Sequence, residues 1–172
     1  MAQKLYEIVK FPDPVLEKVA EPVTRFDAEL KKLIDDMFAS MYAAEGIGLA
    51  APQINLSRRI TIIDLSFQKN PDDKIVLINP EVVAVEGRQH EEEGCLSLPD
   101  IREKVTRAAW VKIRAQNASG EHFEIEGTEL LARAFQHEID HLDGILFINK
   151  ISRLKRDLVS RRIRKLIKNG EW

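Results

Sequence analysis

The chain has 172 residues, of which 44% are hydrophobic and 31% charged, with a formal net charge of −2. These values are typical of one soluble globular domain over residues 1–172, large enough to bury its own core. The sequence excludes a membrane span, internal repeats and an intrachain disulfide, because Cys95 is the single cysteine. Since the N-terminal residues also lack the apolar core of a secretory signal, we expect a cytoplasmic protein with no membrane contact.

The first predicted element is a helix over Thr24–Tyr42. Thr24 can cap it, Asp27 stands in the capping-box position, and apolar residues recur at intervals of three and four as a core stripe. Strand patterns bounded by Pro, Gly or Asn follow at Arg59–Leu65, Lys74–Asn79, Val82–Glu86, Trp110–Gln116 and His122–Glu126.

A second helix is predicted to begin after Gly127, with Thr128 as its cap, and a third to span about Ser152–Lys168. Because the strands follow one another without intervening helices, antiparallel pairing is favoured. The pattern predicts an α+β fold with an N-terminal and a C-terminal helix.

The segment His137-Glu138-Ile139-Asp140-His141 carries the strongest chemical signal. Its two histidines are four residues apart, so both imidazoles lie on one helix face and can hold one metal ion, while Glu138 can act as a general base on bound water. Two surface histidines on an amphipathic helix can produce the same pattern by accident. A third ligand would distinguish the two interpretations.

The extended zinc-protease pattern does not supply that ligand, because Phe147 stands where its third histidine belongs. The acidic residues of the last segment, Asp157 and Glu171, lie in a strongly basic context and are poor candidates. We expect His90 and His122 to be exposed or structural. Cys95 remains: Gly94 precedes it, and a thiolate with two imidazoles is a sound ligand set for a d-block divalent cation.

Three separated segments, Gly46–Gln53 (GIGLAAPQ), Glu93–Ser97 (EGCLS) and His137–His141 (HEIDH), resemble in order and content the three signature motifs of peptide deformylase. The resemblance covers nearly the whole chain, and no position within the motifs departs from it. It implies antiparallel sheets packed around the motif helix, which would be the central metal-binding helix. The implied activity is removal of the N-formyl group from the formylmethionine of new polypeptides, with release of formate.

The resemblance assigns the metal to Cys95, His137 and His141. Metal-bound hydroxide would attack the formyl carbon, and Glu138 would take the proton and later deliver it to the departing amine. The resemblance places the Gln53 side-chain amide and the Leu96 N–H as donors to the developing oxyanion. The ligand chemistry alone favours zinc, whereas the family implies Fe²⁺, with Zn²⁺, Ni²⁺ or Co²⁺ as substitutes.

Ala134 and Leu130 lie one and two turns before His137 on the same helix, so we expect them to form the floor of a pocket for the methionine side chain. Ile47 is an apolar residue between two glycines and is expected to join them. Gly46 and Gly48 are either turn formers or positions where a substrate backbone lies close.

The last segment, residues 150–172, holds nine Lys or Arg and two acidic residues, whereas residues 1–149 hold 17 and 26. Apolar residues recur at helical spacing in this segment, so we expect one face to pack on the body: Leu154, Leu158, Val159, Ile163, Leu166 and Ile167. Its basic face is either a solvated surface or a contact for ribosomal RNA.

Two other functions differ from deformylation in what they require. A general H-E-x-x-H metallopeptidase needs a third histidine or a distal glutamate. A catalytically silent RNA-binding protein would have lost part of the metal set, yet Cys95, His137 and His141 are all present.

Overall fold

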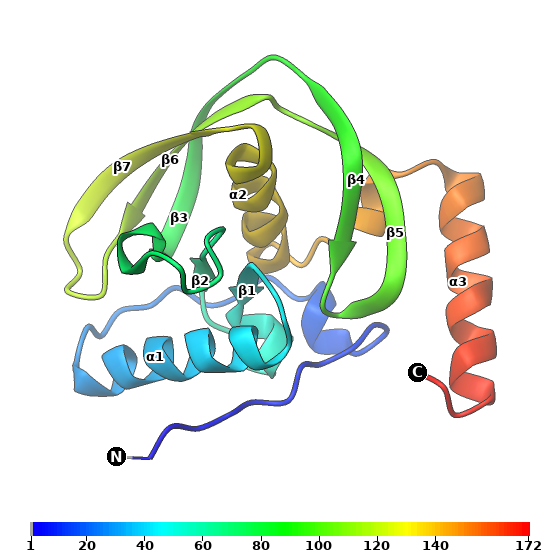
Figure 1. Ribbon diagram of the computed structural model, residues 1–172, viewed down its shortest axis with the longest axis horizontal. Helices are drawn as coiled ribbons and strands as arrows, with labels where there is room; N and C mark the ends of the chain where they lie inside the picture. The colour runs from blue at the N-terminus through cyan, green and yellow to red at the C-terminus, as the bar shows by residue number, and fades with distance from the viewer. Residues whose placement is uncertain (1) are drawn as a thin grey trace.

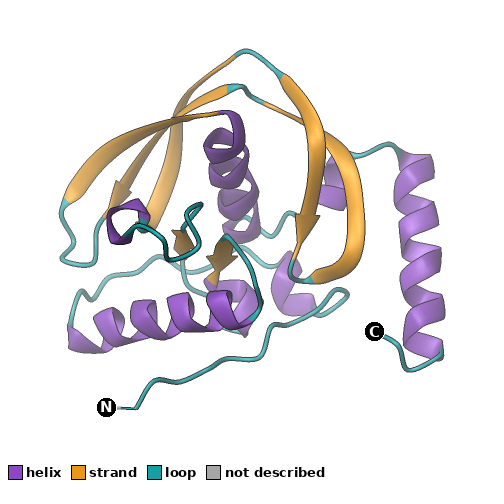
Figure 2. Cartoon of the chain, viewed as in Figure 1, coloured by secondary structure: helices purple, strands orange, loops and turns teal. Residues whose placement is uncertain are grey.

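The computed structural model describes residues 2–172 and confirms the α+β class (Figures 1 and 2). The helices are α1 (Ala28–Ala43), α2 (Glu129–Leu142) and α3 (Arg153–Lys168). The strands are β1 (Gly48–Ala50), β2 (Ile60–Ile63), β3 (Ile75–Glu86), β4 (Gln89–Cys95), β5 (Leu98–Arg107), β6 (Trp110–Gln116) and β7 (His122–Thr128).

All strand pairs in the two sheets are antiparallel, as expected from serial strands. One sheet has five strands in the order β1-β2-β3-β6-β7, and β4 pairs with β5 in a second, two-stranded sheet. Figure 1 shows β3, β6 and β7 arching over α2 on one side and the β4–β5 hairpin on the other. The helix that carries the two histidines is therefore enclosed by both sheets.

Helix α1 begins at Ala28, four residues later than predicted. The capping assignment to Thr24 was wrong: the Asp27 carboxylate accepts a hydrogen bond from the Leu30 N–H at 3.0 Å and is itself the cap. An aspartate satisfies one of the free amides of the first turn, so the helix starts there.

The two predicted strands on either side of Asn79 and Pro80 are a single strand, β3. The Asn-Pro step is absorbed by a register shift between Ile78 and Glu81, and Asn79 takes a positive φ of 50°. The Asn79 side chain pairs with the backbone N–H and C=O of Val23, at 2.8 and 2.9 Å.

The β4–β5 hairpin was not predicted as a strand pair. Five of the seven residues in β4 are polar or charged, and the three exposed residues are consecutive, so the alternation of a half-buried strand is missing. The pairing runs from Gln89 opposite Arg107 to Cys95 opposite Leu98.

Three apolar clusters fix these elements around one another. The buried face of α1 packs on β1 and β2 through Met37, Met41 and Ile62. The five-stranded sheet covers α2 through residues such as Ile113 and Phe135. A third cluster joins β5 to the segment after α2 and to α3.

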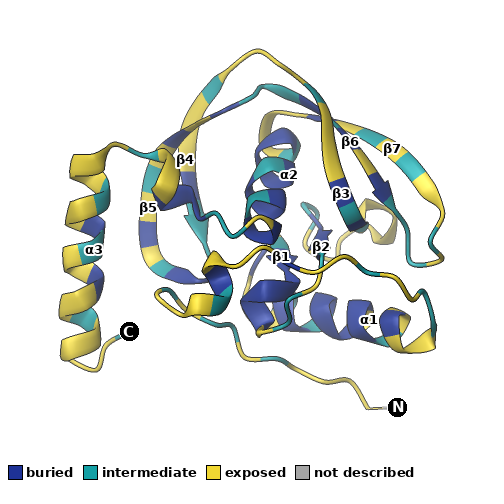
Figure 3. Ribbon diagram, turned by 180° about the vertical axis from the view of Figure 1, so that it is seen from behind, coloured by how far each residue is buried: buried dark blue, intermediate teal, exposed yellow. Residues whose placement is uncertain are grey.

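Helix α3 packs through a narrower face than predicted. Val159 and Ile163 are buried, whereas Leu154, Leu158 and Ile167 are 70%, 55% and 45% exposed. Figure 3 shows most of α3 exposed, at the edge of the molecule. Within residues 2–172, no helix has the length and apolar character needed to cross a membrane.

Candidate active site

Helix α2 places the two histidines. Phe135, Ile139 and Leu142 are buried and anchor the helix, while His137 and His141 lie one turn apart on a neighbouring face. Thr128 occupies the cap position, but its side chain makes no capping bond. Tertiary packing, not the cap, therefore holds the helix in place.

The β4–β5 hairpin brings Cys95 to the two imidazoles. The Cys95 Sγ atom lies 3.3 Å from His141 Nε2, which is 3.2 Å from His137 Nε2. The three ligand atoms all lie within 4.8 Å of one another. One thiolate and two imidazole nitrogens converging from a helix and a hairpin would suit a transition-metal ion, and a site with three protein ligands is typical of catalytic metals.

The position that holds the third histidine in the extended protease pattern is occupied by Phe147, whose ring stacks on His137 at a centroid distance of 6.2 Å. His90 and His122 are exposed and lie outside the group. Cys95 is thus the third member of the group of candidate metal ligands, together with His137 and His141.

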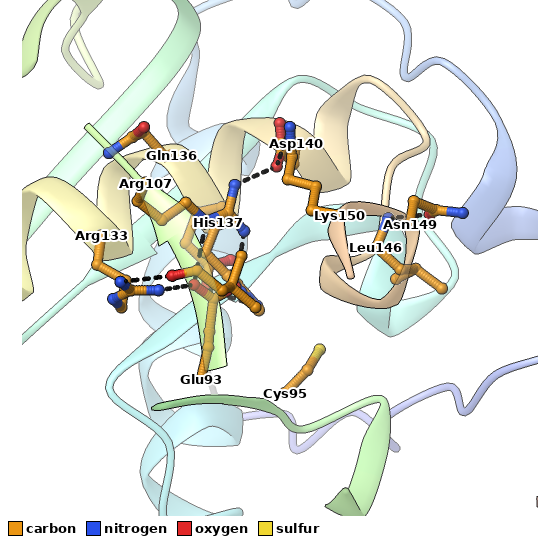
Figure 4. A network of polar contacts seen from close by, with 12 residues as sticks. Glu93, Cys95, Arg107, Arg133, Gln136, His137, Asp140, Leu146, Asn149 and Lys150 are labelled. Carbon is orange, nitrogen blue, oxygen red and sulfur yellow. Dashed lines mark hydrogen bonds and ion pairs between the residues drawn. The ribbon is translucent and has the colours of Figure 1, made fainter. Parts of the chain in front are cut away.

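A buried ionic network supports His137 (Figure 4). His137 Nδ1 lies 2.7 Å from the Glu93 carboxylate, which also accepts two hydrogen bonds from Arg107, at 3.1 and 2.6 Å, and one from Arg133 at 2.8 Å. Arg107 also pairs with Asp140. A carboxylate on the far ring nitrogen fixes the orientation and tautomer of a ligating imidazole.

The charges in this network are strongly perturbed. Burial alone would raise the pKa of Glu93, but hydrogen bonds from His137 and Arg107 hold that pKa well below its usual range. Burial and the neighbouring His137 both lower the pKa of His141, so its imidazole stays neutral. Neutral imidazole is the form that binds a metal.

Glu138 points into the site from the same helix and is 5% exposed. Burial raises the pKa of Glu138 to about 7, and the charge on His137 offsets this only in part. One carboxylate oxygen, Oε1, lies 4.0 Å from His137 Nε2. A carboxyl group with a pKa near neutrality can both accept and return a proton.

The first motif forms β1 and the short 3-10 helix Ala51–Ile54 beside α2. A Cβ at Gly48 would stand 2.5 Å from Glu138 Oε1, and one at Gly46 would stand 2.6 Å from the Leu96 side chain. Any larger residue at Gly48 would displace the Glu138 carboxyl group, and one at Gly46 would move the end of the Leu96 side chain.

The amide of Gln53 is held in one orientation. Its oxygen accepts a hydrogen bond from the Ala50 N–H at 2.9 Å, so its NH₂ group faces Ser97 Oγ at 3.1 Å and Cys95 Sγ at 3.5 Å. Leu96 follows Cys95 in the turn between β4 and β5. Both proposed oxyanion donors thus lie beside the Cys95 end of the cluster.

A cavity of about 710 Å³ opens onto this centre. Its walls include two of the candidate metal ligands, Cys95 and His137. They also include all five residues predicted for the substrate pocket: Gly46, Ile47, Gly48, Leu130 and Ala134. Ala134 is 8% exposed, whereas Leu130 is 52% and Ile47 37% exposed. The three apolar side chains therefore run from the depth of the cavity to its rim.

Sequence reasoning missed the supporting residues Arg107, Arg133 and Thr61, and treated Glu93 only as part of a motif. A signal was present for the arginines, because an Arg on the apolar side of a helix or in an alternating strand needs a buried partner. Nothing in the local sequence names that partner. Thr61 stands among isoleucines and reads as an ordinary strand residue.

The fold and this group of candidate ligands, two from a helical His-Glu-x-x-His segment and one cysteine from a hairpin, are those of a metal-dependent hydrolase. The polypeptide deformylase family model matches residues 5–157. The chain therefore belongs to the polypeptide deformylase family and is a metal-dependent enzyme that removes the formyl group from new polypeptides.

Individual relatives agree with the family assignment. The peptide deformylase of Acidobacterium capsulatum is 72% identical over 165 residues, covering 96% of this chain and 97% of that protein. The enzyme of Heliobacterium modesticaldum is 51% identical over 86% of this chain and 94% of its own. The crystal structure of a peptide deformylase from Legionella pneumophila has a TM-score of 0.90 and 44% identity, with 97% of this chain and 98% of that chain covered.

Proposed function

We propose that Cys95, His137 and His141 hold the catalytic metal and that Glu138 carries the proton in deformylation. The observation that supports this most strongly is the convergence of the three ligand atoms beside a buried carboxyl group at the wall of the cavity. When bound, the metal supplies Lewis acidity that activates water near neutral pH.

The chain's own side chains complete the reaction. Glu138 takes a proton from the attacking water and delivers it to the amine nitrogen as the formyl C–N bond breaks, which releases formate and a free N-terminus. The Gln53 NH₂ group and the Leu96 N–H donate hydrogen bonds to the formyl oxygen and stabilise the negative charge that develops on it. The fixed orientation of the Gln53 amide supports this role, because a preoriented donor needs no reorganisation.

The cavity supports a pocket for the methionine side chain over Ile47, Leu130 and Ala134, with Gly46 and Gly48 leaving room for a substrate backbone. Residues 1–172 act as one catalytic domain in this proposal, and the match of the family model to residues 5–157 supports that extent. Because formylated chains arise where proteins are synthesised, we place the enzyme in the cytoplasm.

Release of formate tests the function directly. Protein purified anaerobically and loaded with metal is mixed with a formyl-Met peptide, and formate is followed over time. We expect turnover that disappears after chelation and returns on reloading. A metal-loaded protein that released no formate would contradict the proposal, and so would cleavage of an internal peptide bond.

We propose Fe²⁺ as the native metal, with Zn²⁺, Ni²⁺ or Co²⁺ as substitutes. An oxidisable ion beside a thiolate should make the iron form more sensitive to air or peroxide than the nickel or zinc form. The test is the half-life of activity in air for each loaded form. Equal decay of all three would contradict iron.

The basic helix α3 supports a contact with ribosomal RNA. Its residues Arg161, Arg162, Arg164 and Lys165 are all exposed, and the helix lies at the edge of the molecule (Figure 3). A formylated N-terminus exists briefly on chains that leave the ribosome, so an enzyme held there meets its substrate at a higher effective concentration.

A further inference from the structure

Thr61 is a fully buried threonine in a strand that otherwise consists of isoleucine. The strand β2 reads Ile60-Thr61-Ile62-Ile63, and all four residues are 0% exposed. Alternation along the strand sends Ile60 and Ile62 into the cluster with α1, and Ile63 into the cluster with α2. Thr61 therefore faces α2, where an aliphatic side chain would pack without a polar group to satisfy.

The Thr61 hydroxyl lies between two acceptors, the Leu49 carbonyl oxygen at 3.0 Å and Glu138 Oε2 at 3.5 Å. A hydroxyl has one proton, so it donates to one of these oxygens at a time. An ionised carboxylate is the stronger acceptor of the two. The strand register supports this arrangement, because Thr61 lies opposite Ala50, the neighbour of Leu49 in β1.

This contact distinguishes the two oxygens of Glu138. Oε1 faces Gly48 and lies 4.0 Å from His137 Nε2, on the metal-cluster side, whereas Oε2 lies against Thr61. Within residues 2–172, the Thr61 hydroxyl is the one hydrogen-bond partner of the Glu138 carboxyl group. Catalytic contacts of this length shorten when substrate closes the site.

We infer that Thr61 is a positioning residue for Glu138: its hydroxyl donates to Oε2 of the ionised carboxylate at the back of the site and so presents Oε1 to the attacking water. This inference rests on the proposed role of Glu138. The alternative is that the hydroxyl only satisfies the Leu49 carbonyl, in which case its removal affects stability and not the chemical step.

The decisive comparison is between Thr61→Val and Thr61→Ser. Valine keeps the shape and loses the hydroxyl, whereas serine keeps the hydroxyl and loses a methyl group. We expect Thr61→Val to lower kcat by about tenfold, since small misplacements of a catalytic group cost rate steeply. Thr61→Ser should stay within about twofold of the parent kcat, and bound metal and KM should be unchanged in both variants.

Ser40 offers a matched control. Its hydroxyl is also buried and donates to a backbone carbonyl, that of Asp36 at 2.7 Å, in helix α1. The same hydroxyl accepts a hydrogen bond from the Tyr6 N–H at 2.9 Å. Ser40→Ala therefore removes two buried hydrogen bonds away from the cavity and should change the melting temperature without changing kcat. All rates are measured per bound metal, below the melting temperature of each variant.

Combining each Thr61 variant with Glu138→Gln tests whether Thr61 affects kcat through Glu138. If Thr61 acts through Glu138, Thr61→Val should not lower the residual rate of Glu138→Gln any further. A parent-like kcat in Thr61→Val, equal losses in valine and serine variants, a loss that appears in KM or bound metal, or full additivity with Glu138→Gln would each overturn the inference. Near-native turnover in Glu138→Gln alone would instead contradict the proposed role of Glu138.

Discussion

The Glu138 carboxyl group is buried between Gly48 and Thr61, and this burial sets its pKa. Gly48 leaves room for one carboxyl oxygen and Thr61 contacts the other. The group is 5% exposed, and burial raises its pKa to about 7. A carboxyl group in this setting can exchange a proton with water near neutral pH, which is the property that the reaction requires.

Replacing Glu138 with glutamine should keep the metal and lose most of the activity. Glutamine preserves the shape but cannot carry the proton, so we expect kcat to fall by about 10²- to 10⁴-fold. Metal content by elemental analysis and formate release are measured on the same sample. Turnover close to that of the parent would rule out Glu138 as the proton carrier.

Replacing Cys95 with serine should weaken metal binding or change the preferred metal, because a hydroxyl is a poorer donor to a soft ion. Cys95 is the only cysteine, so a sulfur-to-metal charge-transfer band in the cobalt-loaded protein reports on this residue alone. We expect the band in the parent and not in the variant. Unchanged affinity and metal preference would remove Cys95 from the site.

The histidines could be predicted from the sequence, whereas the residues that support the site could not. Two histidines on one helix face follow from spacing alone. Glu138 and Thr61 are 77 positions apart, and Glu93 and His137 are 44 apart. Such contacts are set by which strands pair and in which register, and no local pattern encodes that choice.

At the scale of elements, Glu93 joins β4, β5 and α2. Its carboxylate binds Arg107 of β5 and both Arg133 and His137 of α2. The groups are nearly inaccessible to solvent, so each charge depends on its partners. The network therefore links the β4–β5 hairpin, which sequence patterns did not predict, to α2, which they predicted most clearly.

Glu93→Gln should destabilise the protein and loosen the metal together. Removing one charge from a buried network typically costs about 3 to 5 kcal/mol, and losing the support of a ligating histidine lowers metal affinity by about 10- to 100-fold. Denaturant unfolding and metal titration measure the two effects. The control is Glu92→Gln, whose exposed pair with Arg102 should contribute less than about 1 kcal/mol. Equal behaviour of the two variants would contradict the role of the network.

For α3, sequence patterns predicted a wider buried face than the structure has. Its bounds, Arg153–Lys168, agree with the prediction, and Ser152 caps the helix by accepting a hydrogen bond from the Lys155 N–H at 3.3 Å. Periodicity identifies an apolar stripe but not how much of it meets a partner. Two residues are buried, and contacts such as the bond from Trp172 Nε1 to the Phe11 carbonyl at 2.6 Å hold the end of the chain.

Neutralising the basic face should weaken ribosome binding without affecting catalysis. The variant changes four exposed residues to glutamine: Arg161, Arg162, Arg164 and Lys165. Phosphate contacts release counterions, so co-sedimentation of the parent should fall steeply with salt, and the variant should bind less at every salt concentration. Turnover of a short formyl peptide should stay nearly unchanged.

The control for this variant carries the same charge change on the acidic body: Lys18, Arg25, Lys31 and Lys69 to glutamine, all exposed. It should sediment with ribosomes as the parent does. If both variants bind equally, the contact reflects net charge alone. If the α3 variant binds like the parent, α3 is a packed helix with a solvated face.

At the scale of the whole molecule, the candidate metal site lies where separately packed regions meet. Cys95 belongs to the β4–β5 hairpin and packs on the cluster that includes α3, whereas the histidines belong to α2, which packs under the five-stranded sheet. An ion bound by all three ligands therefore links parts of the fold that different apolar clusters stabilise. Because an unfolded chain has no preformed site, binding energy adds to folding stability.

Removing the metal should lower the melting temperature of the entire domain. At a free metal concentration about 100 times Kd, binding contributes about 2.7 kcal/mol. For a chain of this size, that corresponds to roughly 5 to 10 °C. Calorimetric scans compare loaded protein with protein that was chelated, freed of chelator and rescanned, and reloading should restore the higher value. The Cys95→Ser variant serves as the control, because its melting temperature should depend much less on metal. Identical melting temperatures for loaded and metal-free parent protein would show that the ion does not join the hairpin to the helix.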